Sequence, residues 1–260
     1  MREPTLGSRR RAGSGRLRRA AELFVIEEWS LDSGFVEKVW RTHSEPESKF
    51  ISIAASHWQM VFMAQHGVTR LSVRGPASVA TITEVPEDGE FLGIVFSLGT
   101  FMPVMPLYRL IDRAVTLPAA SKSSFWLDGI EWEAPSPQNV DVFVDRLVCH
   151  GLLVRDPVVA ESLQADIDGV STRTVQRHVA RATGLTRGTI RQIARAESAV
   201  EALARGASPP DAARSAGYAD QAHLSRSLQR FIGQTPAEVK SCGRHWSVAS
   251  PVETRSLSDR

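Results

Sequence analysis

The feature that most constrains the fold is a helix–turn–helix pattern that occurs twice in the last third of the chain. Residues 157–238 contain little that is typical of β-strands. One pattern runs from Pro157 to Gly184, and a second with the same plan follows about fifty residues later. Apolar residues in both recur at helical spacing, so this region is predicted to form an all-helical domain.

The first unit has clear helix boundaries. Asp156 and Pro157 supply an N-cap residue and a proline at the first helical position, which predicts a helix near 157–166. After a turn at 168–170, Ser171 is a natural N-cap for a second helix that ends at Gly184. Its apolar seam is narrow and consists of Val175, Val179 and Ala182.

The outer face of that second helix consists of long hydrogen-bonding side chains. They are Arg173, Gln176, Arg177 and Arg181. Arg pairs with guanine and Gln with adenine in the major groove, so this face is typical of a helix that reads DNA.

The second unit repeats the arrangement. Ser208 and Pro209 begin its first helix, a turn follows at 217–220, and its second helix covers 221–231. The seam is Leu224, Leu228 and Phe231, and the outward side chains are Gln221, Ser225, Arg226 and Arg230.

A single long helix over 186–204 is expected to connect the two units. Such a helix spans roughly 27 Å. Successive major-groove faces of straight B-DNA are about 34 Å apart. The connector therefore favours bent DNA or shallow insertion of one unit. A circular-permutation gel that shows no bend would count against bent DNA.

The second unit resembles the signature of AraC/XylS-family regulators. The resemblance rests on residues 217–226, followed by Phe231, Gly233, Thr235 and Pro236. Residues 169–177 are similar to that family's first unit, and the whole resemblance covers about 157–240. Val175 and Val179 stand where the family more often has Leu and Phe, so the first seam is expected to be less tightly filled.

The resemblance also implies which residues contact DNA. The base-reading positions are Arg173, Gln176, Arg177, Gln221, Ala222, Ser225 and Arg226. Arg181 and Arg230 are expected to contact phosphates, which position a protein without specifying sequence. For Arg226 a packing or backbone role is left open beside the base-reading role.

The N-terminal part reads mainly as strands separated by turns. Apolar runs or alternation predict strands at 23–26, 58–64, 68–74, 79–85 and 91–96. Short helices and loops are expected over 103–136, and a helix from about 140 to Gly151. The predicted fold is α+β: a β-rich, cupin-like or small-barrel N-terminal domain with flanking helices, then an all-α domain of two helix–turn–helix units joined by a long helix.

Charge is distributed unevenly along the chain and supports four segments. Residues 1–20 hold 7 Arg against 1 Glu and predict a disordered basic tail. Residues 21–154, with 9 basic and 17 acidic side chains, are predicted to form an effector-binding or dimerisation domain. Residues 155–241 form the expected DNA-binding domain, and 242–260 a C-terminal tail. The region 155–245 holds 13 basic against 9 acidic residues, which suits contact with a polyanion.

The N-terminal domain offers little catalytic chemistry. His43, His57 and His66 are dispersed, and Cys149 with His150 is not arranged as a catalytic pair. No metal, cofactor or enzymatic activity is therefore expected. Several aromatic residues are candidates for an apolar effector pocket or, alternatively, for the core: Trp58, Phe96, Phe125, Trp126 and Trp132.

These observations predict a sequence-specific, cytoplasmic DNA-binding transcription regulator. Its expected partners are double-stranded DNA, RNA polymerase, a small-molecule effector and a second copy of the chain, with no membrane. Two alternatives remain at this point: a non-specific architectural DNA-binding protein, and a cupin-like enzyme with a helical tail.

Overall fold

The structure, a computed structural model, describes residues 18–19, 26–44, 48–164 and 171–241. Nearly all of the expected basic tail 1–20, most of the expected strand 23–26, the turn at 168–170 and the tail 242–260 lie outside the described residues.

The N-terminal region is built from β-strands, as predicted. Their bounds are β1 Arg18–Arg19, β2 Glu27–Trp29, β3 Val36–His43, β4 Ser48–Ser52, β5 Gln59–Gln65, β6 Val68–Arg74, β7 Thr81–Val85, β8 Glu90–Phe96, β9 Thr100–Phe101, β10 Ala114–Thr116, β11 Ser124–Leu127, β12 Ile130–Glu133 and β13 Val154–Arg155. The largest sheet has the order β10-β6-β5-β8-β3-β2, and a second sheet has the order β1-β4-β7.

The hairpin of β5 and β6 forms at the turn that the sequence predicted. His66 and Gly67 have φ angles of 50° and 73°. Positive φ at both central residues is what a tight two-residue hairpin needs, because its twist then matches that of the strands. Gln65 pairs with Val68, so the register begins directly at the turn. The strands predicted at 58–64, 68–74 and 91–96 are confirmed as β5, β6 and β8.

Two parts of the strand region differ from the prediction. Strands β3 and β4 were not predicted, although β3 lies inside the large sheet between β8 and β2. The expectation of only short helices and loops over 103–136 is wrong, because β10 extends the large sheet and β11 pairs with β12. A short 3-10 helix, Leu107–Arg109, is the helical part of that segment.

Seven helices are described, six of them in the C-terminal region. Their bounds are α2 Val140–Cys149, α3 Pro157–Gln164, α4 Thr172–Thr183, α5 Arg187–Ala204, α6 Pro209–Ser215, α7 Gln221–Phe231 and α8 Pro236–Ser241. The side chains of Ser171, Thr186 and Ser208 each accept a hydrogen bond from the backbone N–H three residues later. These caps satisfy N–H groups that have no partner within the helix, and they fix where α4, α5 and α6 begin.

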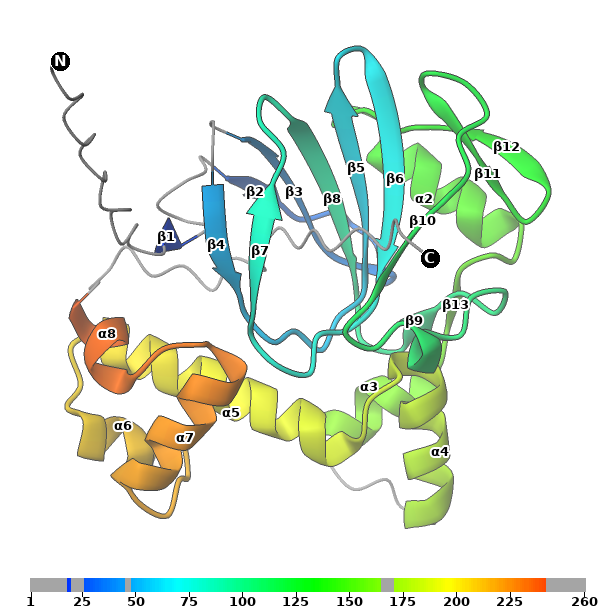
Figure 1. Cartoon of the computed structure of the whole chain (residues 1–260). Helices are drawn as coiled ribbons and strands as arrows, with labels where there is room; N and C mark the ends of the chain where they lie inside the picture. The colour runs from blue at the N-terminus through cyan, green and yellow to red at the C-terminus, as the bar shows by residue number, and fades with distance from the viewer. Residues whose placement is uncertain (1–17, 20–25, 45–47, 165–170, 242–260) are drawn as a thin grey trace, which may run out of the picture.

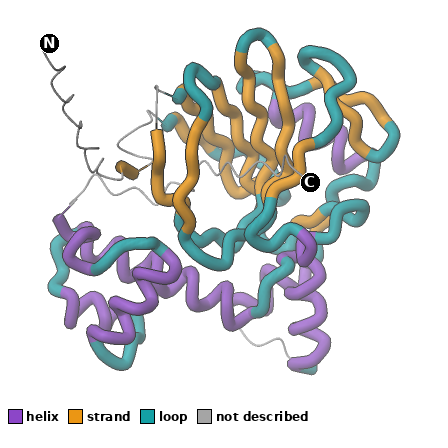
Figure 2. The backbone as a smooth tube through the Cα atoms, viewed as in Figure 1, coloured by secondary structure: helices purple, strands orange, loops and turns teal. Residues whose placement is uncertain are grey.

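Helices α3 to α8 and the strands occupy opposite sides of the molecule (Figures 1 and 2). The sheets lie together, α2 lies beside the β11–β12 hairpin, and α3 to α8 form a separate helical layer in which α5 runs between the two helix–turn–helix units. The α+β architecture is therefore confirmed. One hydrophobic cluster nevertheless includes buried residues of both layers, among them Phe96 and Leu107 of the strand region and Val179 and Leu228 of the helices.

Candidate nucleic-acid interface

Helix α4 separates a buried seam from an exposed polar face. Val175 and Val179 are buried, and Ser171 caps the helix through a 3.2 Å hydrogen bond from the Thr174 backbone N–H. The three predicted base-reading residues of this unit, Arg173, Gln176 and Arg177, are all exposed. No ion pair to Arg173 or Arg177 is formed by the part of the chain that the structure describes.

Helix α7 has the same construction. Asp220 caps it by accepting a 2.6 Å hydrogen bond from the His223 backbone N–H. Gln221, Ala222 and Arg226 are exposed. Ser225 is half-buried, and its hydroxyl donates to the Gln221 carbonyl at 2.9 Å, so this side chain must turn away from the helix before it can contact a base.

The two helices have nearly the same pattern of buried and exposed residues when their N-caps, Ser171 and Asp220, are aligned. Seam residue Val175 then corresponds to Leu224, and exposed Arg177 corresponds to Arg226. One further exposed residue, Gln229, lies one helical turn after Ser225 on the outward face of α7. Gln229 is not among the predicted base-reading residues, although its spacing of four residues from Ser225 indicates the same helix face.

The two predicted phosphate ligands are exposed and lie over aromatic rings. The Arg230 guanidinium is 4.9 Å from the ring centre of Phe231 in its own helix. The Arg181 guanidinium is 5.2 Å from the ring centre of Phe101, which belongs to strand β9. Arg181 therefore also links α4 to the strand region.

Both recognition helices contact the strand region through their C-terminal ends. In the second unit, the carbonyls of Arg230 and Phe231 accept hydrogen bonds from the backbone N–H groups of Ala80 and Ala54, at 2.9 and 2.7 Å. In the first unit, the end of α4 at Gly184 lies against the backbone of Leu107. The N-terminal halves of both helices, which carry most of the predicted base contacts, extend away from the strands (Figure 1).

Asp156 joins three elements at the start of the helical region. One carboxylate oxygen accepts a 3.1 Å hydrogen bond from the Val158 backbone N–H at the start of α3. The other lies 2.6 Å from His178 Nδ1 on α4. The Asp156 N–H also donates to the Gly99 carbonyl in the strand region at 2.8 Å. This one residue fixes how the first unit approaches the strands.

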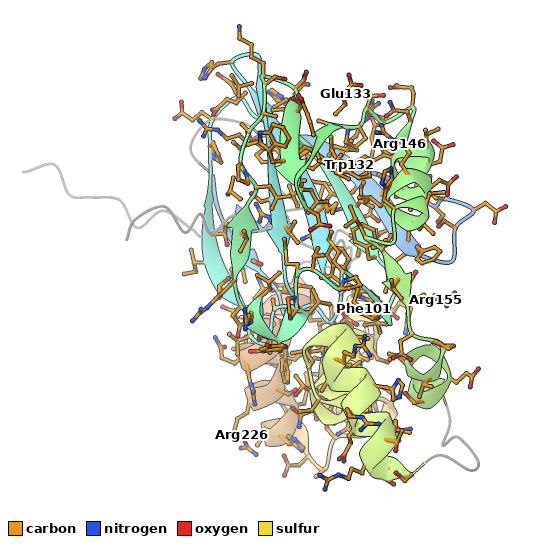
Figure 3. All side chains as sticks on the ribbon, turned by 90° about the vertical axis from the view of Figure 1, so that its right-hand side faces the viewer. Phe101, Trp132, Glu133, Arg146, Arg155 and Arg226 are labelled. Carbon is orange, nitrogen blue, oxygen red and sulfur yellow. The ribbon has the colours of Figure 1, made fainter. Side chains whose placement is uncertain are left out.

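The aromatic residues named as pocket candidates lie mostly in the core. Trp58 and Phe96 are buried and stack with ring centres 4.1 Å apart. Trp132 is buried against Phe143, Arg146 and His150, whereas Trp126 is 44% exposed (Figure 3). These contacts favour the core-filling alternative for Trp58, Phe96 and Trp132.

A pocket of about 520 Å³ lies elsewhere in the strand region. Its apolar wall includes Phe62, Phe91 and Leu92, and the segment 134–137 before α2 covers one side. Arg41, also part of the lining, forms a 2.6 Å ion pair with Glu27. None of the five aromatic candidates named from the sequence lines this pocket.

The described residues 18–19, 26–44, 48–164 and 171–241 contain neither a metal-site cluster nor a membrane-spanning helix. Within these ranges, no group of three or more His, Cys, Asp or Glu side chains has the arrangement of a metal site. None of the helices in the same ranges is both long enough and apolar enough to cross a bilayer.

Comparison with known proteins connects the helical region to a family. Residues 164–241 match the family model described as a helix-turn-helix domain. No curated protein matches the chain. Among solved structures, that of ToxT from Vibrio cholerae is similar, with a TM-score of 0.39 and 10% identity, over 84% of this chain and 99% of ToxT. The family match and the two capped helices with polar outward faces, α4 and α7, agree: residues 164–241 form an AraC-type helix-turn-helix domain, and a chain with this domain is a DNA-binding transcription regulator.

Proposed function

We propose that α4 and α7 enter neighbouring major grooves of one promoter site and read its sequence. Arg173, Gln176 and Arg177 read bases from α4. On α7, Gln221, Ala222, Ser225 and Arg226 contact the second half-site, and Arg181 and Arg230 hold the flanking phosphates. The observation that carries this proposal is the matching burial pattern of two capped helices with exposed arginines at corresponding positions, Arg177 with Arg226 and Arg181 with Arg230.

The test is a gel-shift titration on DNA from upstream of the protein's own and neighbouring genes, with random DNA as competitor. Removing one good base contact costs about 1–3 kcal/mol of discrimination at one base pair. Arg173→Ala combined with Gln176→Ala should therefore abolish the competitor-resistant shift. Arg70→Ala, in the β5–β6 hairpin that points away from the helices in Figure 1, is the matched control and should bind as the unaltered protein does.

Two results of the gel-shift titration would contradict the proposed function. A shift that random DNA removes as readily as promoter DNA would favour a non-specific architectural role. A regulator should prefer its own site by at least about a thousandfold. If promoter DNA gives no specific shift, selection from random-sequence DNA decides, and its failure would overturn the proposal.

The N-terminal region is proposed to receive an effector, to dimerise, or both, and so to change DNA affinity or contact with RNA polymerase. Its division from the DNA-binding region at residues 154 and 155 remains part of this proposal. The 520 Å³ pocket is the candidate effector site, because its volume falls in the range of small-molecule sites. Its apolar wall beside the Arg41–Glu27 pair suits a molecule with an apolar body and one polar end.

A further inference from the structure

A second pocket, of about 230 Å³, lies between the connector helix α5 and the recognition helix α7. Its lining is strongly basic. The residues that matter are Gln192 and Arg195 from α5, Tyr218 from the turn, and His223, Arg226 and Arg230 from α7. Three guanidinium groups therefore line a space of the size of a phosphate group and its water.

Among the described residues, no acidic side chain forms an ion pair with any of these three arginines. Within the described ranges, the ion pairs of the second unit are Arg205 with Glu201 at 3.5 Å and Arg214 with Asp211 at 3.3 Å. Arg195, Arg226 and Arg230 have no such partner there. Like charges gathered without a counter-charge repel one another, and a bound anion removes that repulsion.

Arg195 is held in place before any ligand arrives. Its guanidinium lies 5.5 Å from the ring centre of Tyr218. The Tyr218 hydroxyl bonds to Ser227 at 2.8 Å, and the ring makes an edge contact with His223 at 5.1 Å. Burial raises the pKa of Tyr218, so the ring stays uncharged beside the arginines. A planar guanidinium positioned in this way loses little side-chain entropy when it binds two oxygens of one phosphate group.

The pocket lies on a different side of α7 from Gln221 and Ser225, two of the proposed base contacts. At about 100° per residue, His223, Arg226 and Arg230 fall within an arc of about 60°. Gln221, Ala222 and Ser225 fall on an arc centred roughly 120° away. Leu224, Leu228 and Phe231 face the core, so Arg226 lies close to the outermost line of α7, whereas His223 and Arg230 lie towards one flank. The flanks of a helix in a major groove face the phosphates that border the groove. Figure 3 shows Arg226 at the outer surface of the helical region.

We infer that this pocket binds one phosphate group of the DNA backbone, with Arg195 of the connector helix as a ligand alongside Arg226 and Arg230. This inference rests on the proposed function and extends it. It gives α5 a direct part in DNA binding, and for Arg226 alone it replaces the base contact proposed above with a backbone contact.

The first test is the salt dependence of DNA binding by Arg195→Met, which removes the charge and keeps an apolar stem beside Tyr218. Loss of one phosphate contact makes the negative slope of log K against log salt less steep by about 0.9 and weakens binding about eightfold at 0.1 M salt. The loss should be equal on the selected operator and on random DNA. Arg205→Met, the same change at the end of the same helix and outside the pocket, is the matched control and should leave the slope unchanged.

The second test locates the phosphate. Operator duplexes are prepared with one neutral methylphosphonate at each backbone position in turn. At one position beside the second half-site, neutralisation should weaken binding by the unaltered protein and have no further effect on Arg195→Met. Arg195→Lys should recover part of the affinity, and equal melting temperatures of all variants exclude a folding defect.

Several outcomes would overturn the inference while the proposed function stands. One is specific operator binding by Arg195→Met with an unchanged salt slope. Another is a loss for Arg195→Met or Arg226→Met confined to one base pair, since that identifies a base contact. A third is stabilisation by pyrophosphate that needs Arg195 while DNA binding does not, which would assign the pocket to a free phosphate. Failure of the unaltered protein to select any DNA would instead overturn the proposed function.

Discussion

At the residue scale, Glu197 is an acid in an unusual place. It lies on α5, and burial is the main reason that its pKa is raised to about 7, with repulsion from Glu201 adding to the effect. Lys38 on β3 acts in the opposite direction, so the electrostatic environment of Glu197 includes the strand region. Lys38 itself is paired with Glu28 at 2.9 Å, which limits what it can offer Glu197.

The raised pKa predicts a pH-dependent stability with a definite sign. Between the ordinary value of 4.5 and about 7, folded Glu197 holds a proton that the unfolded chain has lost. Its contribution to the free energy of unfolding therefore declines as pH rises through this window, by roughly 3 kcal/mol in total. Glu197→Gln should be more stable than the unaltered protein at pH 8 in urea titrations and similar at pH 5. Glu201→Gln, on an exposed neighbour, should show a much smaller change.

Side-chain roles were predictable where helical spacing alone decides them. Val175, Val179 and Leu228 had to be buried and Arg173 exposed once the two helices were recognised, because the period of 3.6 leaves one face for each. The position of Arg195 was not predictable. Its contact with Tyr218 depends on how α5 and the following turn pack in space, and no local pattern records that.

At the element scale, two glycines end comparable segments under different constraints. Gly184 after α4 and Gly217 after α6 have φ angles of 74° and 72°, where side chains are strained. A Cβ at Gly217 would meet nothing within 4 Å. A Cβ at Gly184 would lie 2.9 Å from the carbonyl of Leu107 in the strand region.

The pair separates backbone strain from contact with the strand region. Gly217→Ala should cost about 1–2 kcal/mol of unfolding free energy, the usual cost of a left-handed residue. Gly184→Ala has the same backbone strain and must also displace the Leu107 backbone. Its free energy of unfolding should therefore fall by clearly more than that of Gly217→Ala in thermal or urea unfolding. Equal losses would mean that the contact between α4 and the strand region has no energetic weight.

The strands show why some elements escape prediction. Strand β3 carries charged side chains at Glu37, Lys38 and Arg41 between buried ones, so its sequence lacks the apolar run that marks β8. Asp128 and Gly129, with φ of 51° and 73°, form the turn of the β11–β12 hairpin. That dipeptide is a strong indication of a hairpin, which the expectation of short helices and loops over 103–136 did not use.

At the scale of the whole molecule, the candidate effector pocket and the DNA-binding helices lie at opposite ends of the same strands. The pocket includes Arg41 near the end of β3 and Leu92 near the start of β8. The opposite ends of these strands, near Val36 and Phe96, lie towards the helical layer (Figure 1). We therefore propose that a molecule in the pocket influences DNA binding through the sheet and does not touch the helices.

Filling the pocket tests this arrangement. Ala64→Trp adds bulk inside the pocket, whereas Ala119→Trp, on an exposed residue outside it, adds the same bulk to the surface. The fluorescence of an apolar dye such as anilinonaphthalene sulfonate should rise with the unaltered protein and with Ala119→Trp, and not with Ala64→Trp. Operator affinity of Ala64→Trp should also change by at least about threefold. Unchanged dye binding and affinity in both variants would remove the pocket as an effector site.

The attachment of both recognition helices to the strand region through their C-terminal ends bears on the promoters themselves. The connector α5 and these two attachments together fix the distance and the rotation between α4 and α7. One base pair inserted between the half-sites turns the second by roughly 35° about the DNA axis. The molecule can follow only by giving up the Ala54 and Ala80 hydrogen bonds or by twisting the DNA. Functional promoters should therefore differ in bases at single positions far more readily than in the length of the stretch between the half-sites.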